Sequence, residues 1–531
     1  MLLTVLIPVF RLDNDRKRNL EFIYNRLISH YNESEIEIVL GIQDSSIDEY
    51  YHKFDRAVLK HYNYNDKDFN KSYIFNRCIE EGISGEYLVF LDGDVYLPFH
   101  KLREELFDKR HEVVKPFSEC VFLDKETTHT FLYEKKAIAD KNLKRITATG
   151  ACCIILNKDI LSSVRMDENF VGWGWEDIDF ANQLSSKFHI EAFGHQAVHL
   201  YHEPSSANYN NKIYYNSKYK YTHKPYNKCV KKDIGVILSY FSPCNFKKPR
   251  ENLLYMLDKL ESAKCPTTLV EAVMPDSEPL ILPKWIKHHQ IKVTNKSYLF
   301  MKENLYNIGI KKTQYSKILF LDSDILFDNP NFIDDSSRLL DNYDIIQPFE
   351  SSLWLDKEMV PLLDYNFKHS FAKGIVKQQS INAIHYHPGF SWGATRHFLN
   401  SIGGLYDQHP VGGSDLAFAF AVHPENPSKG LVQHWLNTNQ LWIHTNQYTS
   451  YREKVSNFKP RVGYLEGCIC RHLYHGTQAK RNYIDRNKQY LPDLIDNDYP
   501  LVYNKDKILE WINTEHSLRC LEYFQNRDED E

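Results

Sequence analysis

The sequence predicts an α/β protein with two tandem domains, each built around a mostly parallel sheet. The first observation is length, since 531 residues, 42% hydrophobic and 25% charged, suffice for two to four globular domains of about 100–200 residues. The second is a repeat: an apolar run ending in Asp-x-Asp occurs in GEYLVFLDGDVYLP (85–98) and in YSKILFLDSDILFDNP (315–330). The third is that the tetrapeptide HLYH follows each run, at 199–202 and at 472–475.

The elements before each Asp-x-Asp run occur in the same order. Each half begins with a short β-rich run that reaches a proline, LLTVLIPVF (2–10) and DIGVILSYFSPC (233–244). Segments with helical periodicity follow, RKRNLEFIYNRLISHY and RENLLYMLDKLESA, and then second strands, EIEIVLGIQD and TTLVEAVM. This alternation of strands and helices is typical of a parallel sheet covered by helices.

The repeat continues after the Asp-x-Asp runs and sets the expected domain boundaries. Residues 149–184 and 388–422 share a glycine, a short apolar run, a helical segment, and a Gly-rich turn followed by an acid at a helix start. We therefore expect domains at 1–207 and 233–490. The polar segment 208–232, rich in Tyr, Asn and Lys, is the expected linker, and 491–531 is expected to be a C-terminal helical extension.

Composition excludes several classes of protein. The net charge of −5 comes without a long basic run, so the signature of strong nucleic-acid binding is missing. The first apolar run is too short to span a bilayer and lacks a basic n-region and a cleavage site, so we expect a cytoplasmic protein without a transmembrane segment. The ten cysteines show no metal-ribbon spacing, which favours free thiols over a zinc site. The oligomeric state stays open.

The Asp-x-Asp pairs predict metal sites. Asp92 and Asp94 follow a wholly apolar strand, and Asp322 and Asp324 follow its counterpart. Open α/β sheets bind ligands at the carboxyl ends of their strands. Two carboxylates there form a hard-oxygen site for Mn²⁺ or Mg²⁺, and that ion can bridge to a diphosphate. An acidic turn without function is the alternative, and it explains two copies poorly.

The histidines of HLYH are candidate further ligands of the same ions. His199 and His202 form the first pair, and His472 and His475 the second. Imidazole suits Mn²⁺ better than Mg²⁺. Side chains alternate faces along a strand, so we expect one histidine of each pair to complete a metal site, and which one stays open.

The two halves resemble nucleotide-sugar-dependent glycosyltransferases with the GT-A fold, which is Rossmann-like. FLDGDVYLP and FLDSDILF resemble the Asp-x-Asp motif of these enzymes, and GWGWEDIDFANQL (172–184) is similar to the Gly-Trp-Gly-x-Glu-Asp segment of inverting galactosyl-, N-acetylgalactosaminyl- and chondroitin-type transferases. The second half resembles bacterial GT-A transferases. The resemblance implies a nucleotide-sugar donor, UDP-linked by expectation, bound with the metal by Asp92 and Asp322. Asp44, in the GIQDSS turn, is expected to face the nucleobase or ribose.

In the first module the resemblance and the chemistry imply an inverting mechanism. Such a transferase needs a general base for the acceptor hydroxyl and a cation at the leaving diphosphate. We assign Asp177 as the base and Glu176 to acceptor hydroxyls, with Trp173 and Trp175 as flat platforms for a sugar. An acidic N-terminal cap of an ordinary helix is the alternative.

The second module departs from this pattern. Its VGGSDLAFAF segment keeps one acid, Asp415, with Ser414 in place of the glutamate. Asp415 is a candidate base or acceptor-orienting residue, and Trp392 is the candidate platform. Whether this module inverts, retains or has lost activity stays open.

Basic and polar residues of the second module are candidates for donor binding. Lys480, Arg481 and Arg486 follow the second HLYH and are suited to neutralise a diphosphate. FMKENLYNIGI (300–310) resembles a nucleotide-sugar-contacting helix of bacterial transferases, which implies roles for Lys302 and Asn307. A solvated basic amphipathic helix is the alternative.

Two functions follow from these predictions. The first is a bifunctional, metal-dependent glycosyltransferase acting on a hydroxyl acceptor, which can be a glycan, a polysaccharide or a modified nucleobase. Net charge does not point to a nucleic-acid acceptor. The second is a carbohydrate-binding or scaffold protein in which one module, and the second before the first, is inactive.

Overall fold

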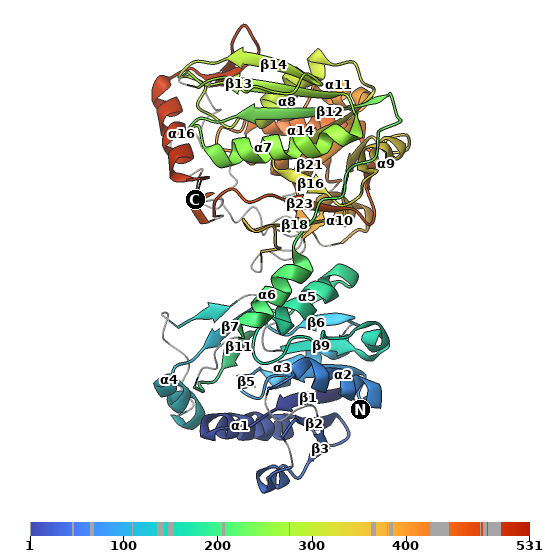
Figure 1. The fold of residues 1–531 in the computed structure, drawn as a ribbon, viewed down its shortest axis with the longest axis vertical. Coiled ribbons are helices and arrows are strands. Elements are labelled where there is room, and N and C mark those ends of the chain that lie inside the picture. The colour runs from blue at the N-terminus through green and yellow to red at the C-terminus, as the bar shows by residue number, and fades with distance from the viewer. Residues whose placement is uncertain are drawn as a thin grey trace. The chain divides into compact units, whose positions relative to one another are not determined.

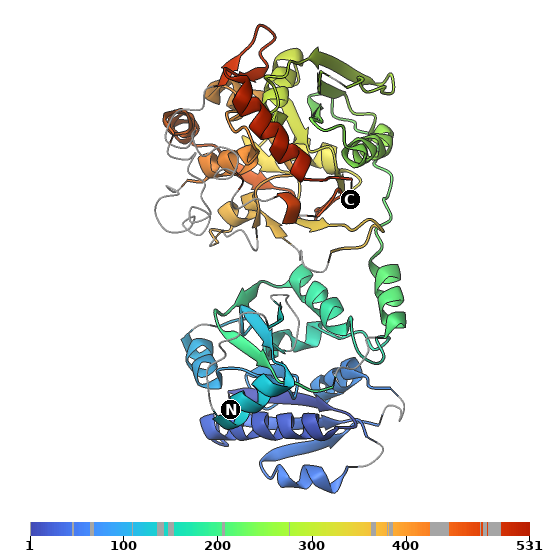
Figure 2. The same cartoon turned by 90° about the vertical axis from the view of Figure 1, so that its left-hand side faces the viewer.

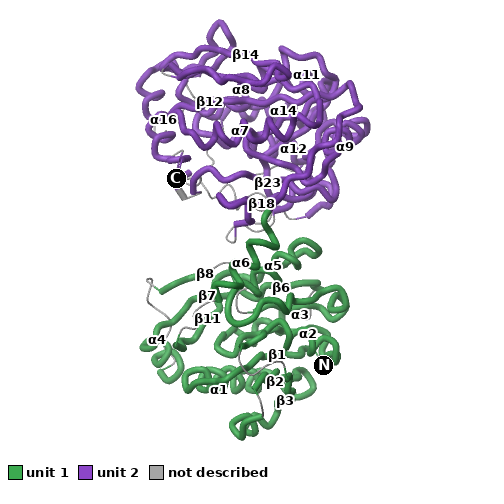
Figure 3. Tube along the Cα trace, in the orientation of Figure 1, with its two compact units in different colours: residues 1–220 green, residues 221–531 purple. Residues whose placement is uncertain are grey.

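A computed structural model describes the fold (Figure 1). It describes residues 2–530 except 45–46, 64–67, 109, 135–142, 147–152, 204–207, 276, 363–367, 380, 382–385, 425–444, 478, 482–485 and 487–500. The chain forms two compact units, Met1–Lys220 and Tyr221–Glu531 (Figure 3). None of the helices in the described residues is both long and apolar enough to cross a lipid bilayer.

Unit 1 contains a seven-stranded sheet and a four-stranded sheet. The large sheet has, in spatial order, β10 (Ile190–Ala192), β6 (Val113–Lys115), β9 (Cys153–Asn157), β4 (Tyr87–Leu91), β1 (Leu3–Val9), β2 (Ile36–Ile42) and β3 (Ala57–His61). The small sheet has β5 (Val95–Tyr96), β11 (Gln196–His199), β7 (Glu119–Phe122) and β8 (Arg145–Ile146). The α-helices are α1 (Asn14–His30), α2 (Lys71–Glu81), α3 (Phe99–Asp108), α4 (Lys125–His129), α5 (Glu176–Lys187) and α6 (Tyr209–Tyr219).

Unit 2 contains a seven-stranded and a five-stranded sheet, and a separate hairpin. The large sheet has β14 (Ile286–Lys292), β13 (Thr267–Val273), β12 (Ile234–Phe241), β15 (Lys317–Leu321), β21 (Ser391–Thr395), β17 (Ile345–Gln347) and β22 (Val462–Tyr464). The small sheet has β16 (Ile325–Phe327), β23 (Ile469–His472), β18 (Ser351–Trp354), β19 (Lys368–Ser370) and β20 (Tyr386–His387), and the hairpin has β24 (Leu501–Tyr503) and β25 (Leu509–Trp511).

The described α-helices of unit 2 lie between and after the strands of its sheets along the chain. They are α7 (Lys247–Leu260), α8 (Lys302–Lys312), α9 (Phe332–Leu339), α10 (Phe371–Val376), α11 (Arg396–Ile402), α12 (Ser414–Val422), α14 (Asn446–Phe458) and α16 (Thr514–Asn526), with a 3-10 turn η6 (Ala479–Arg481). Helix α16, red in Figure 2, packs on this unit because its buried residues Cys520, Tyr523 and Phe524 join the core of the large sheet.

The two large sheets share one strand order and one set of directions. In unit 1, β3, β2, β1 and β4 are parallel, and β9 runs antiparallel to both β4 and β6. In unit 2, β14, β13, β12 and β15 are parallel, and β21 runs antiparallel to both β15 and β17. The predicted fold class, α/β with two mostly parallel sheets, is therefore confirmed.

The central strands form where the sequence is continuously apolar. Every residue of β1 (LTVLIPV) and of β4 (YLVFL) is buried, as is every residue of β15 (KILFL). A strand buried on both faces needs apolar side chains at each position, as parallel sheets covered by helices require. Several helices begin at polar caps, such as Asp13, which accepts from the Arg16 amide before α1.

The predicted domain boundaries stay a prediction, although the structure places the segments concerned. The expected linker, 208–232, contains α6, whose Asn211 and Tyr215 are buried in unit 1. Its second part packs on unit 2, where the Cys229 amide donates to the Ala263 carbonyl. Because the segment is mostly polar, its sequence did not predict this helix, which has a narrow buried face. In the expected helical extension, the described residues form the β24–β25 hairpin before α16.

Candidate functional site

Each Asp-x-Asp motif forms the turn that connects the large sheet to the small one. In unit 1, Asp92 follows the last residue of β4, and β5 begins directly after Asp94. In unit 2, Asp322 and Asp324 occupy the same place between β15 and β16. The carboxylates therefore lie at the carboxyl end of a central strand, where open α/β sheets bind ligands.

Strand register brings the HLYH segments to these turns. β11 ends at His199, which pairs with Val95 of the antiparallel strand β5, and the next amide, that of Leu200, donates to the Asp94 carbonyl over 2.8 Å. Unit 2 repeats both contacts: His472 pairs with Ile325, and the Leu473 amide donates to the Asp324 carbonyl over 2.7 Å. In both units, therefore, the HLYH segment is hydrogen-bonded to the Asp-x-Asp turn.

Both histidines of each pair reach the second aspartate of the motif. His199 Nε2 lies 3.7 Å from Asp94 Oδ1, and His202 Nε2 lies 3.0 Å from Asp94 Oδ2. In unit 2, His472 Nε2 and His475 Nε2 lie 3.5 and 2.9 Å from Asp324 Oδ2. Within each trio the ligand atoms lie within 4.8 Å of one another.

The geometric premise behind a single ligating histidine per pair is therefore wrong, whereas the number of histidines that bind a metal stays a prediction. That premise assumed that the alternation of a strand continues through all four residues. β11 ends at His199 and β23 ends at His472. The residues that follow belong to no strand, and the second histidine lies beside the same aspartate as the first.

The residues of each trio fit a divalent cation. Asp94 Oδ1 and Asp324 Oδ1 are buried and accept no hydrogen bond within the described structure, a condition that a bound cation would relieve. Burial lowers the pKa of His199, and burial lowers that of His472 to about 3. Neutral imidazoles with free lone pairs are the form that binds metal. Burial raises the pKa of Asp94, but His199 and His202 outweigh it and hold that pKa at about 2.

The first aspartate of each motif contacts a buried lysine. Lys71 Nζ lies 2.7 Å from Asp92 and 2.9 Å from Asp177, and its side chain is 3% exposed. In unit 2, Lys302 Nζ lies 3.0 Å from Asp322. Asp92 and Asp322 thus lie outside the Asp-His-His trios in the described structure, and their predicted metal role stays a prediction.

Sequence reasoning missed Lys71, although a signal for it existed. FNKSYIFN (69–76) and FMKENLYN (300–307) share Phe, Lys and Asn at equal spacing, and each lysine begins its helix, α2 or α8. The alternative of a solvated helix at 302–312 is wrong, because seven of the residues of α8 are buried.

Asn307, expected to contact the nucleotide sugar, instead fastens α8 to a loop. Its Nδ2 donates to the Leu405 carbonyl and its Oδ1 accepts from the Leu405 amide, both over 2.8 Å. Asn76 makes the same two bonds to Met166 in unit 1. This residue lies one and a half turns past the lysine, so it faces away from the Asp-x-Asp turn.

Glu176 and Asp177 lie at the start of α5, beside Lys71. Lys71 Nζ donates to both carboxylate oxygens of Asp177 and so fixes its orientation. Burial, and then Asp177, raise the pKa of Glu176 to about 8. The residue before the helix, Trp175, has φ 79°, a left-handed conformation that is costly outside glycine.

The equivalent helix of unit 2, α12, begins with Ser414 and Asp415 after Gly413 at φ 109°. Asp415 is half-buried, and its Oδ1 accepts from the Leu416 amide over 2.8 Å. Burial raises the pKa of Asp415, but Lys302 and His387 outweigh it and lower that pKa. Asp415 therefore stands where Asp177 stands in unit 1, near the lysine of the same site.

The tryptophans occupy three different settings. Trp173 lines a small pocket together with Asp92 and Asp94, whereas Trp175 packs against Tyr215 of α6, with ring centroids 5.1 Å apart. Trp392, the candidate platform of unit 2, is 6% exposed and belongs to the core, and it also lines a small pocket with Asp322 and Asp415. Its strand, β21, pairs with β15 in the middle of the sheet, which buries the ring.

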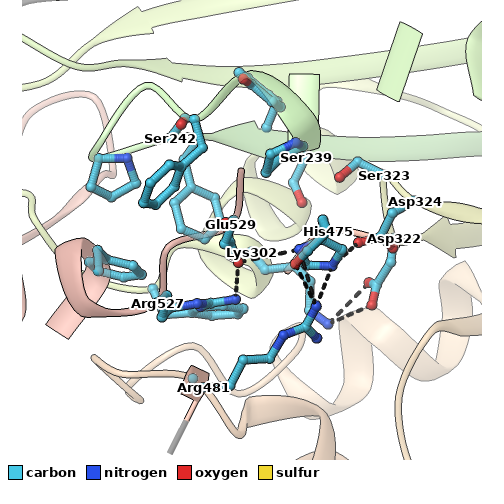
Figure 4. Close-up of a pocket in the computed structure, with 18 of the residues that line it drawn as sticks. Ser239, Ser242, Lys302, Asp322, Ser323, Asp324, His475, Arg481, Arg527 and Glu529 are labelled. Carbon is cyan, nitrogen blue, oxygen red and sulfur yellow. Dashed lines mark hydrogen bonds and ion pairs between the residues drawn. The ribbon is translucent and has the colours of Figure 1, made fainter. Parts of the chain in front are cut away.

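A pocket of about 200 Å³ surrounds the Asp-x-Asp turn of unit 2 (Figure 4). His387 and Phe390, stacked with centroids 3.8 Å apart, supply an aromatic wall that was not foreseen. The cationic side chains that line the pocket are Lys302, Arg481, Arg486 and Arg527. Lys480, predicted beside them, is not among the lining residues and instead forms an ion pair with Asp528 over 2.7 Å.

Asp44 and its neighbour fix the loops beyond β2. Asp44 accepts from the Arg11 amide over 3.0 Å and from the Tyr51 hydroxyl over 3.1 Å. Gln43 is buried; its Oε1 accepts from the Asn70 amide over 2.7 Å and thereby places the start of α2 and Lys71. The hydrogen bond to the Asn70 amide therefore explains why a glutamine suits position 43.

A repeated asparagine on the first helix of each unit was also missed. Asn19 of α1 donates to the Tyr201 carbonyl, and Asn252 of α7 donates to the Tyr474 carbonyl, both over 3.0 Å. The matching segments RNLEF and ENLLY carried the signal. Each asparagine holds the turn that carries the two histidines.

Comparison with known proteins yields only distant structural similarity. No protein-family model and no curated protein matches the chain. Among solved structures it is similar to S. aureus TarS 1–349 in complex with UDP-GlcNAc, at 14% identity and TM-score 0.27, over 39% of this chain and 60% of that chain. It is also similar to the mannosyltransferase PcManGT from Pyrobaculum calidifontis in complex with GDP-Man and Mn²⁺, at 14% identity and TM-score 0.27, over 38% and 58%. The chain thus matches less than two thirds of the length of either structure.

Proposed function

We propose that this chain is a bifunctional, metal-dependent glycosyltransferase that uses nucleotide-sugar donors, UDP-linked by expectation, and a hydroxyl acceptor. One observation carries the proposal. In each unit an Asp-His-His trio and a Lys-Asp pair share one Asp-x-Asp turn at the end of a central strand. A structural acidic turn would need neither two convergent histidines nor a buried lysine, and it would not need them twice.

The charges of each site suit a nucleotide-sugar donor. A divalent cation bound by Asp94, His199 and His202 would neutralise charge on the leaving diphosphate. Lys71 supplies a fixed positive charge beside Asp92, where it opposes the repulsion between neighbouring carboxylates. In unit 2, Arg481 and Arg486 line the pocket and are suited to bind phosphate oxygens.

Proton transfer in unit 1 is assigned to Asp177. Its carboxylate is partly accessible, and Lys71 fixes its orientation, as a general base requires. Glu176, with a pKa raised to about 8, is protonated near neutral pH and suits a hydrogen-bond donor to an acceptor hydroxyl. This division of roles supports an inverting reaction in unit 1.

In unit 2 the same role falls to Asp415, which has Ser414 as its neighbour in place of a glutamate. His387 and Phe390 provide a stacked aromatic surface in the pocket at the Asp-x-Asp turn. The different neighbours of the base support a different acceptor or donor for each unit. A carbohydrate-binding role without transfer is the competing function for unit 2, and it rests on the missing second acid.

Turnover of a nucleotide-sugar panel with Mn²⁺ tests the proposal. The full chain is compared with Asp94→Ala, Asp324→Ala and the double variant, with Asp258→Ala, an exposed acid on α7, as the control. Each single variant should lose one activity, by about 100-fold or more as for removal of a charge-stabilising group, and the double variant should lose both. Wild-type turnover and donor binding in the double variant would refute the enzyme. Loss in Asp94→Ala alone would assign unit 2 to binding.

A further inference from the structure

The segment Arg527–Asp530, which follows α16, borders the pocket of unit 2. Arg527 and Glu529 line that pocket together with His475 and Asp324 (Figure 4). Two bonds hold the segment in place: Asp528 pairs with Lys480 over 2.7 Å, and Asp530 accepts from the Lys248 amide over 2.7 Å. A segment so far along the chain is therefore built into the site.

The residue after the second HLYH allows this close approach. Gly476 has φ 78°, and a Cβ there would lie 2.8 Å from the Asp528 carbonyl oxygen and 3.1 Å from the Glu529 Cα. Any other residue would push the backbone of the segment away. Unit 1 has Glu203 at this position, and no such segment crosses its described site.

His475 has a carboxylate at each of its ring nitrogens. Nε2 lies 2.9 Å from Asp324 Oδ2, and Nδ1 lies 3.4 Å from Glu529 Oε1. Glu529 is held in turn by an ion pair with Arg527. Arg481 NH2, 2.8 Å from His475 Nε2 and 3.1 Å from Nδ1, lies against the same ring.

In unit 1 a backbone carbonyl oxygen, and not a carboxylate, lies at Nδ1 of the second histidine. His202 Nε2 faces Asp94, and its Nδ1 lies 2.9 Å from the backbone carbonyl oxygen of Glu203. In both units the second histidine thus has an oxygen at Nδ1 and the aspartate at Nε2. Metal-binding histidines are oriented in this way, because an acceptor at one nitrogen fixes the tautomer that presents the other lone pair to the metal.

We propose that Glu529 is a positioning residue of the second Asp-His-His site, accepting the Nδ1–H of His475 so that Nε2 faces the cation. This inference rests on the proposed metal dependence of that site. It implies that unit 2 binds its metal only with the segment after α16 in place, whereas unit 1 needs a backbone carbonyl alone.

Mn²⁺ binding to the full chain tests the inference without any turnover. The background is Asp94→Ala, which leaves the trio of unit 2 as the site to be titrated, by isothermal calorimetry and by the electron paramagnetic resonance signal of free Mn²⁺. Glu529→Ala should raise the Kd by about 10–100-fold, the usual effect of losing an outer partner of a ligand histidine. Glu529→Gln, which keeps a neutral acceptor at the same place, should recover part of that loss.

The matched control is Glu522→Ala, which removes an exposed carboxylate of α16. Its Kd should stay within about 3-fold of the background, and unfolding midpoints without metal should agree among the variants. A Glu529→Ala Kd equal to the background, a Gln variant no better than Ala, or an equal loss in Glu522→Ala would each overturn the inference. A background that binds no Mn²⁺, or binds it independently of Asp324, would instead refute the metal dependence of unit 2.

Discussion

At the scale of single residues, the second histidine of each HLYH segment differs most from the pattern of a strand. His202 and His475 approach their aspartates more closely than His199 and His472 do. Both lie beyond the last residue of a strand, so the alternation that governs the strand no longer applies. Six candidate ligands in two trios therefore predict two equivalents of bound metal per chain.

Removal of the second histidine should remove one equivalent. His202→Ala and His475→Ala should each lower Mn²⁺ stoichiometry from two per chain to one at about tenfold the wild-type Kd, and the double variant should bind neither ion at that concentration. Equilibrium dialysis with metal analysis measures this directly. His100→Ala, an exposed histidine on α3, should change nothing. Two equivalents in His475→Ala at an unchanged Kd would show that only His472 of that pair is a ligand.

At the scale of elements, the start of α5 concentrates acidic groups in a buried place. Burial, and then Asp177, raise the pKa of Glu176 from 4.5 to about 8. The folded chain therefore keeps a proton that the unfolded chain releases. This group contributes its full stability below about pH 4.5 and loses it as the pH rises through about 8.

Glu176→Gln should remove that dependence. The variant carries a neutral side chain of equal size at every pH. The free energy of unfolding of the variant minus that of the wild type should therefore increase as the pH rises from about 5 to about 9. Urea denaturation across this range measures the difference. Glu104→Gln, an exposed position on α3, should run parallel to the wild type. A wild-type minus variant difference that does not change with pH would show that Glu176 is ionised when folded.

The first helix of each unit also acts on the site through one asparagine. Asn19 and Asn252 are buried and donate to the carbonyl of the tyrosine in HLYH. Asn252→Ala should leave the Tyr474 carbonyl unpaired at a cost of about 1–3 kcal/mol. Asn19→Ala should cost about 0.5–1.5 kcal/mol, because Arg18 also donates to the Tyr201 carbonyl over 2.9 Å. Each variant should weaken Mn²⁺ binding in its own unit only. Denaturation and metal titration check both effects. Asn14→Ala, exposed on the same helix α1, should have neither effect, and unchanged metal affinity in Asn19→Ala would confine the bond to stability.

The limits of sequence reasoning follow from the range of each interaction. The central strands and the Asp-x-Asp turns could be predicted, because apolar runs and a repeat are local features. Lys71 could have been predicted from its counterpart Lys302, because the segments 69–76 and 300–307 share Phe, Lys and Asn at equal spacing. Glu529 had no signal, because its partner His475 lies in another element and the path of the chain between them decides their contact.

At the scale of the whole molecule, the chain consists of two units with separate cores. Among the described residues, two hydrophobic clusters lie wholly within 2–200 and two lie wholly within 226–524. No cluster of described residues draws on both units. Each trio is likewise assembled from one unit, Asp94 with its histidines in the first and Asp324 with its histidines in the second.

Fragments 1–220 and 221–531 should therefore fold and bind metal separately. Each has its own core, and a domain with its own core can fold alone, so each fragment should unfold cooperatively and bind one Mn²⁺ within about threefold of the full-chain Kd for that site. Circular dichroism melts, gel filtration and Mn²⁺ titration measure these properties. Asp94→Ala in the first fragment and Asp324→Ala in the second are the controls, and each should abolish binding. A fragment that unfolds without cooperativity, or that folds yet needs its partner to bind Mn²⁺, would show that the sites are not independent.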